Sequence, residues 1–263
     1  MPLGVALLLG IVEGLTEYLP VSSTGHLVLA ARVLGRQAGA FEIVIQLGAI
    51  LAVVVHYRAL FAEHARGLAH RRPESLRLAA ALALGFVPVA IVGKLAGHAI
   101  KDRLFAPHPI AIALAIGGVV MIVVERARAA RKVHGESGLD KVTPRRALTI
   151  GVLQCFALFP GTSRSMTTIV AGQLTGLSTA TAAEFSFLLG VPTLGAATIY
   201  EGLKSRHELL AQSGGPAVAV GLITSFFVAW AVVASFLRYL QRRGLEPFGW
   251  YRLLLAAVVW RFM

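Results

Sequence analysis

Cysteine is almost absent from this sequence, since Cys155 is the only one among 263 residues. A single cysteine cannot form a disulfide within the chain, so the fold does not depend on an internal disulfide framework. Charged residues are also scarce, at 14% of the chain, whereas hydrophobic residues make up 56%. A chain with so few charges and such long apolar runs is not an ordinary water-soluble domain.

Acidic residues are the rarer of the two charged classes, with 13 Asp and Glu against 25 Lys and Arg and a net charge of +12. Such an excess can indicate a nucleic-acid-binding protein. Here the basic residues gather in short segments between apolar runs, which is typical of the cytoplasmic loops of membrane proteins. We therefore expect an integral membrane protein that contacts anionic membrane lipids and no nucleic acid.

The apolar runs predict an all-α polytopic membrane protein with a single membrane domain over residues 1–263. Proline interrupts two of the runs, at Pro20 and Pro160, because it cannot donate a backbone hydrogen bond within a helix. We interpret these two runs as re-entrant helical hairpins over about 2–34 and 147–177. About six full transmembrane helices are expected over 40–57, 76–99, 109–124, 180–200, 216–237 and 248–260.

The two interrupted segments resemble each other. Gly10-Ile-Val-Glu leads to Pro20-Val-Ser-Ser, and Gly151-Val-Leu-Gln leads to Pro160-Gly-Thr-Ser. A constant offset near half the chain length indicates an internal duplication, with repeat 1 over about 1–125 and repeat 2 over about 144–263. Three full spans between the hairpins would invert the second repeat, and inverted repeats typically have their sites near the middle of the membrane. Chance similarity between apolar helices is the alternative.

Basic residues are unevenly divided between the two faces that this topology creates. Fifteen of the 25 fall on the face that contains the segments 58–72 and 126–146, and eight on the other, among them Arg36, Lys101 and Arg206. Arg164 and Arg252 lie within apolar segments. Because cytoplasmic loops are enriched in Lys and Arg, we expect both termini on the outer side of the membrane.

Two carboxylates lie inside the first hairpin. Glu13 and Glu17 are four residues apart, so on a helix they share one face. Ionisable groups at membrane depth are costly and usually functional. Two such carboxylates without basic neighbours in sequence favour a cation partner, so we expect a divalent cation, Mg²⁺ or Ca²⁺. The alternative is a structural pair satisfied by buried hydroxyls.

Polar residues follow both proline breaks. They are Ser22, Ser23, Thr24 and His26 after the first break, and Thr162, Ser163, Arg164 and Ser165 after the second. Hydroxyls of this kind cap helix starts, and a helix start beside an arginine is a strong anion site. We expect the two tips to bind a phosphate or diphosphate between them. Taken alone, the hydroxyls would be capping or packing residues, and Arg164 would extend to a membrane surface.

Four further polar residues lie in or near the repeats and are candidates for supporting roles, namely Glu42, Gln46, Gln154 and Glu184. Gln46 and Gln154 are expected to donate hydrogen bonds to the site. Glu42 and Glu184 begin repeat-related spans, where a carboxylate near a helix start also has a purely structural reason.

Four motifs occur in a specific order along the chain: Glu13-Gly-Leu-Thr-Glu17, Pro20-Val-Ser-Ser-Thr-Gly-His26, Phe41-Glu-Ile-Val-Ile-Gln-Leu-Gly48 and Pro160-Gly-Thr-Ser-Arg-Ser165. Together they resemble the bacterial undecaprenyl-diphosphatase family, also called bacitracin-resistance proteins. The resemblance implies hydrolysis of a polyprenyl pyrophosphate lipid, undecaprenyl pyrophosphate, to undecaprenyl phosphate and inorganic phosphate, with a divalent cation. It also implies the bacterial cytoplasmic (inner) membrane, recycling of the carrier lipid for cell-wall synthesis, and bacitracin resistance.

The same resemblance implies roles for individual residues. The acidic pair is Glu13 and Glu17, the hydroxyl and histidine are Ser23 and His26, and the phosphate-binding arginine is Arg164. Met166 departs from the family pattern, which commonly has glycine there. Two points stay open: whether Ser23 attacks covalently or positions a water, and whether the protein is a monomer or a homodimer. The alternative function is a lipid-phosphate transporter or flippase, which would share the inverted repeat and the site within the membrane.

Overall fold

The computed structural model describes residues 1–35 and 39–262, without the side chains of residues 98, 101, 102, 206, 208, 210 and 212. Arg36 and the side chains of Lys101 and Arg206, all counted above on the face with fewer basic residues, lie outside this part. The described residues form helices, and their one β-type pairing is an isolated bridge between Glu136 and Leu177. The prediction of an all-α protein is therefore confirmed.

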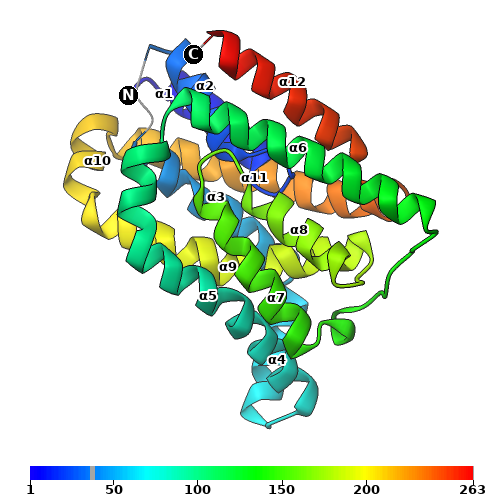
Figure 1. Ribbon diagram of the computed structural model, residues 1–263. Helices are drawn as coiled ribbons and strands as arrows, with labels where there is room; N and C mark the ends of the chain where they lie inside the picture. Colours follow the sequence, from blue (N-terminus) through cyan, green and yellow to red (C-terminus); the bar gives the residue numbers. More distant parts are fainter. Residues whose placement is uncertain (36–38, 263) are drawn as a thin grey trace.

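The first half of the described chain consists of α1 (Leu3–Thr16), α2 (Ser23–Val33), α3 (Ala40–His56), α4 (Arg58–Ala69), α5 (Pro73–Leu104) and α6 (Pro107–Ala130). The break between α1 and α2 contains Pro20, as predicted. The segment 58–72 was expected to be a loop, and this is wrong. It is mostly α4, which bends 72° away from α3 and projects from one end of the bundle (Figure 1). Its sequence is rich in Ala, Leu and Arg, which have high helix propensity.

The second half consists of the short 3₁₀ helix η1 (Leu139–Lys141), α7 (Pro144–Gln154), η2 (Cys155–Leu158), α8 (Arg164–Leu174), α9 (Thr179–Lys204), α10 (Arg206–Ser213), α11 (Gly215–Leu240) and α12 (Glu246–Phe262). The break between α7 and α8 contains Pro160, again as predicted. The short α10 was not expected. It occupies the polar connection between two apolar helices.

Four of the described helices, α5, α6, α9 and α11, are long and apolar enough to cross a membrane, and the bent pair α3–α4 makes a fifth candidate. This confirms a polytopic membrane protein. The expected number of six full spans is not reached by length alone, because α3 and α12 have 17 residues each and a full crossing takes about 20. In α12, Arg252 further reduces the apolar character of the helix.

Helix packing has the symmetry that a duplication predicts. α1 packs on α11 and α7 packs on α5, while α3 pairs with α9 and α6 with α12 (Figure 1). A Cβ added at Gly10 of α1 would lie 2.8 Å from the backbone oxygen of Gly221, and one at Gly151 of α7 would lie 2.6 Å from that of Gly85. Two equivalent close helix contacts therefore occur, although the division into inverted repeats stays a prediction.

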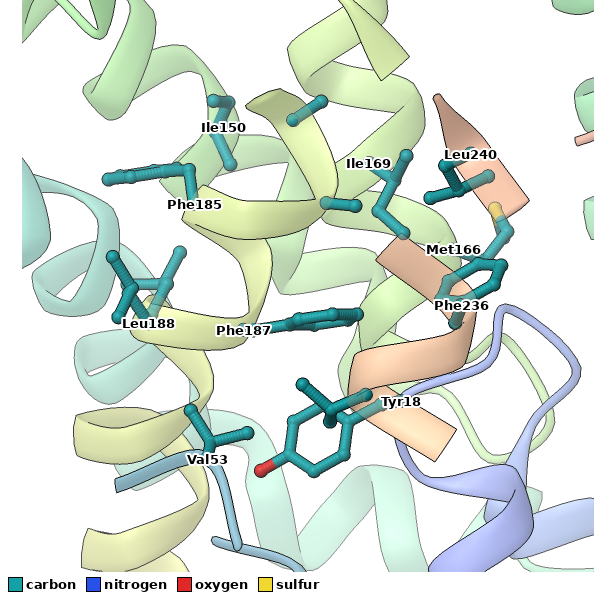
Figure 2. Close-up of a cluster of buried hydrophobic side chains, with 14 of the residues drawn as sticks. Tyr18, Val53, Ile150, Met166, Ile169, Phe185, Phe187, Leu188, Phe236 and Leu240 are labelled. Atoms are coloured by element: carbon teal, nitrogen blue, oxygen red, sulfur yellow. The ribbon is translucent and has the colours of Figure 1, made fainter. Parts of the chain in front are cut away.

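A buried apolar cluster holds both hairpins against α9 and α11. Tyr18, at the first break, meets the edge of Phe187 on α9 at a ring-centre distance of 5.1 Å (Figure 2). Met166 and Ile169 of α8 and Phe236 of α11 belong to the same cluster. Because both hairpins pack on one rigid core, their tips are fixed relative to each other.

Candidate active site

The two hairpin breaks are in direct contact. The Ser165 hydroxyl, from the start of α8, donates to the carbonyl of Leu19 in the first break at 2.8 Å. Arg252 of α12 is fully buried and joins the breaks from outside, donating to the carbonyls of Pro20 at 3.3 Å and Gly161 at 3.0 Å. Segments about 140 residues apart in sequence thus form one unit.

The second helix of each hairpin, α2 or α8, begins with the same strained serine cap. Ser22 has φ 72° and its hydroxyl accepts from the Gly25 amide, and Ser163 has φ 74° and accepts from the Met166 amide. Positive φ is uncommon for serine, and such strain tends to concentrate at functional sites. The first amides of a helix have no partner within the helix, so α2 and α8 both present anion-binding starts at the joined tips.

Glu17 connects the nucleophile candidate to the arginine. The Ser23 hydroxyl donates to Glu17 Oε2 at 2.7 Å, and Arg164 Nη2 donates to Glu17 Oε1 at 3.4 Å. All three side chains are buried. A carboxylate that accepts a hydrogen bond from a hydroxyl can take its proton, so this geometry suits Glu17 as the general base.

Arg164 is held in place by α9 and retains a free donor. Nη1 donates to the carbonyl of Ser186 at 2.8 Å and to its hydroxyl at 3.2 Å, and the guanidinium lies 5.5 Å from the centre of the Tyr18 ring. Its Nε is buried and has no hydrogen-bond partner among the described residues. Buried donors are rarely left unsatisfied, so Nε marks a position where an anionic ligand would bind.

Glu13 provides the test of whether the site fits a cation. It is fully buried, and neither carboxylate oxygen has a hydrogen-bond partner among the described residues. Glu17 and Glu42 add negative charge nearby. No group of three or more metal-binding side chains occurs in the described part of the chain. Mg²⁺ commonly binds one or two carboxylates together with water and substrate phosphates, so Glu13 and Glu17 fit a cation shared with a phosphate.

His26 lies three residues after Ser23, and its ring nitrogens contact other groups. Its Nδ1 is 2.8 Å from the Ser22 carbonyl, and its Nε2 is 2.6 Å from the Tyr251 hydroxyl. The two rings are stacked, with planes 3° apart. Tyr251 was not predicted from the sequence, and neither was the contact of Arg252 with the tips. The available signal was an arginine in an apolar segment, which is costly without partners.

Of the supporting candidates, the structure brings two to the acidic pair. Gln46 Nε2 is 3.5 Å from Glu17 Oε2. Glu42 accepts from the Gly39 amide at 2.6 Å and thereby caps α3, with its second oxygen buried near Glu13.

The other two supporting candidates are not brought to the site. Gln154 is 3.5 Å from the Thr193 hydroxyl, and Glu184 lies near Tyr57 instead. The two threonines of the tips, Thr24 and Thr162, are half-buried, and no hydrogen bond to another site residue is found for either.

An apolar groove of about 700 Å³ lies beside the second tip. It lies between α6 and the second hairpin, where Ile112, Ile116 and Phe156 line it, and Pro160 and Thr162 of the tip are part of its wall. The buried Met166 side chain also lines this groove, so the residue that departs from the family pattern points towards α6. A polar site therefore adjoins an apolar one.

Comparison with known proteins gives matches along nearly the whole chain. The profile of the family described as "Bacitracin resistance protein BacA" matches residues 6–258. An undecaprenyl-diphosphatase of Sorangium cellulosum is 58% identical over 258 residues, which cover 97% of this chain and 84% of that protein. Proteins of the same name from Rhizorhabdus wittichii and Thermoanaerobacter pseudethanolicus are 44% and 46% identical, over 96% and 94% of this chain and 95% and 92% of their own lengths.

Proposed function

Because this chain belongs to the bacitracin resistance protein BacA family, we infer that it hydrolyses undecaprenyl diphosphate between its two hairpin tips. It is a membrane enzyme that cleaves the phosphoanhydride bond and releases undecaprenyl phosphate and inorganic phosphate. The single observation that best supports this site is the buried contact of Ser23 and Arg164 with the same carboxylate, Glu17.

In the proposed reaction Glu17 accepts the proton of the nucleophile. Ser23 donates its hydroxyl proton to Glu17 Oε2, so its oxygen has a lone pair free to attack the terminal phosphorus or to orient an attacking water. In both cases the bond between that phosphorus and the bridging oxygen breaks, and the lipid monophosphate leaves. If Ser23 itself attacks, water then hydrolyses the phosphoserine, which releases inorganic phosphate and restores the hydroxyl.

Charge on the transferred phosphoryl group is stabilised by fixed donors. The unpartnered Nε of Arg164 and the first amides of α2 and α8 converge on the joined tips. Donors that are already in position need no reorganisation when charge develops, and this is usually the largest part of phosphoryl-transfer catalysis. Glu13 and Glu17 would hold a divalent cation, Mg²⁺ or Ca²⁺, and such an ion neutralises phosphate oxygens when bound.

The groove beside the second tip suits the lipid part of the substrate. Its walls are mostly apolar, and they include Thr162, two residues before Arg164. A polyprenyl chain in the groove would hold its diphosphate near the tips. The aligned Ser23–Glu17 pair favours an enzyme over a lipid-phosphate transporter, since transport does not require an activated hydroxyl.

The protein is a multi-pass membrane protein, and we propose that it lies in the bacterial inner membrane with both termini on the outer side. The basic segment between α6 and α7 would then face the cytoplasm and its anionic lipids. In a Cys155→Ser background, a membrane-impermeant thiol reagent on intact cells is expected to label Lys204→Cys and spare Ser137→Cys. The reverse labelling pattern would invert this orientation.

Phosphate release from undecaprenyl diphosphate by the purified protein in detergent tests the function. We expect turnover that is lost in excess chelator and restored by Mg²⁺ or Ca²⁺. Ser23→Ala is expected to lose at least about 100-fold in kcat, the range typical of losing a positioned catalytic group. Ser235→Ala, which changes an exposed serine on α11, is the matched control. An inactive wild type would refute the phosphatase, and full activity in chelator would refute the cation.

A further inference from the structure

The His26 ring lies between its own helix cap and a residue from the far end of the chain. Both of its ring nitrogens are engaged, Nδ1 by the Ser22 carbonyl of its own helix cap and Nε2 by the Tyr251 hydroxyl of α12. Tyr251 is 225 residues away in sequence and about half-exposed. A short hydrogen bond combined with ring stacking indicates a specific pairing, beyond general packing.

The chemistry of the partners determines where the proton of the imidazole lies. A carbonyl oxygen can only accept, so the contact with Ser22 requires a proton on Nδ1. In the neutral ring Nε2 is then an acceptor, and the Tyr251 hydroxyl must be its donor.

Arg252 also fixes the position of Tyr251 along α12 relative to the hairpin tips. Its guanidinium donates to four backbone carbonyls, those of Leu114 and Ala113 on α6 and those of Pro20 and Gly161 at the two tips. Adjacent residues on one helix therefore bind the joined tips and the histidine. Sliding α12 by one residue would break both sets of contacts.

We propose that Tyr251 is a positioning residue of the active site, which donates to Nε2 of the His26 tautomer that the Ser22 carbonyl sets and so fixes the orientation of the ring, while Arg252 fixes α12 against the tips. This inference rests on the proposed phosphatase function only for its effect on turnover. In the resting enzyme Nε2 is thus a proton acceptor, and when His26 takes up a proton the Tyr251 hydroxyl can rotate and accept from it.

The tautomer can be measured without any assay of activity. Protein labelled with ¹⁵N-histidine is examined by NMR in lipid nanodiscs at pH 8, and the His26 signals are assigned by their loss in His26→Gln. We expect a pyrrole-type Nδ1 and a pyridine-type Nε2 in the wild type. In Tyr251→Phe, which keeps the stacked ring but removes the donor to Nε2, we expect the pyridine-type Nε2 signal to move downfield, as that nitrogen does when it loses a hydrogen bond. A doubly protonated ring, an Nε2–H tautomer, or an unchanged His26 spectrum in Tyr251→Phe would each overturn the proposal.

Turnover provides the second readout. Tyr251→Phe is expected to lower kcat about tenfold with KM changed by less than about twofold, because His26, which the family resemblance counts with Ser23 among the catalytic residues, would lose its orientation for the chemical step. Tyr200→Phe removes a hydroxyl that is exposed on α9, and it should leave both constants unchanged. A kcat of Tyr251→Phe within twofold of wild type would also overturn the proposal. A wild type with the expected tautomer but no hydrolysis would refute the phosphatase function alone.

Discussion

Glu17 is a side chain that contacts polar residues of both hairpins. One oxygen accepts from Ser23 of its own hairpin, and the other faces Arg164 of the second hairpin at 3.4 Å. That separation is longer than the 2.7–2.9 Å usual for a charged hydrogen bond, so Glu17 satisfies the guanidinium only partly. A phosphate can therefore bind Arg164 without first having to break a strong ion pair.

Removing one member of this pair has a cost in folding as well as in catalysis. Both side chains are almost completely buried, with exposed fractions of 7% for Arg164 and 4% for Glu17. Breaking a buried pair typically costs about 3–5 kcal/mol, because the remaining charge has no partner. A test of catalysis at Arg164 should therefore keep the positive charge and change only the shape of the group.

At the scale of helices, two glycine contacts hold the hairpins against the rest of the bundle. The α7–α5 contact at Gly151 and the α1–α11 contact at Gly10 leave no room for a methyl group, since backbone atoms lie within 3 Å of the added carbon. Close backbone approach of this kind is typical of helix packing in membranes. The hairpins consequently have little freedom to move their tips apart.

Gly151→Ala tests this contact. Overpacking typically costs about 1–3 kcal/mol, or roughly 2–4 °C of melting temperature for each kcal/mol in a domain of this size. We expect Gly151→Ala to lower the Tm in detergent, although alanine has the higher helix propensity. Gly4→Ala on α1, with no atom within 4 Å of the added carbon, is the control and should be neutral or slightly stabilising. Equal Tm values for the two variants would show that the α5–α7 contact can adjust.

Much of this arrangement could be predicted from local sequence. Pro20 and Pro160 break helices for reasons internal to the chain, and Ser22 and Ser163 cap the helices that follow. The segment 58–72 was predicted to be a loop because it is basic and lies between apolar spans, yet its helix propensity makes most of it α4.

The long-range pairings could not be predicted in the same way. The contact between Tyr251 and His26 joins residues 225 apart and leaves no periodic pattern in the sequence. Four polar residues were predicted to support the site, yet only Gln46 and Glu42 lie at the acidic pair, and Gln154 and Glu184 do not.

At the scale of the whole molecule, the two halves contribute opposite charges to one site. If the repeats are aligned at an offset of 141 residues, Glu13 corresponds to Gln154 and Arg164 corresponds to Ser23. The first hairpin therefore supplies the carboxylates and the second supplies the guanidinium. Neither half contains both the general base and the phosphate-binding arginine, so the proposed reaction requires the two tips to act together.

The most direct test of this joint site is the rate of undecaprenyl diphosphate hydrolysis by Arg164→Lys. Lysine keeps the charge but loses the planar fork, and a charged hydrogen bond contributes about 1.5–3 kcal/mol. If that bond strengthens in the transition state, its loss lowers kcat by about one to two orders of magnitude, since 1.36 kcal/mol is about tenfold.

Arg128→Lys is the matched control for this measurement. Arg128 also donates to backbone carbonyls, those of Gln173 and Leu177 at the opposite end of α8, so its replacement should leave kcat unchanged. At equal concentrations of folded protein, the account predicts a 10- to 100-fold lower kcat for Arg164→Lys alone. A kcat within about twofold of wild type, which corresponds to less than about 0.5 kcal/mol, would contradict it and leave the second hairpin as scaffold.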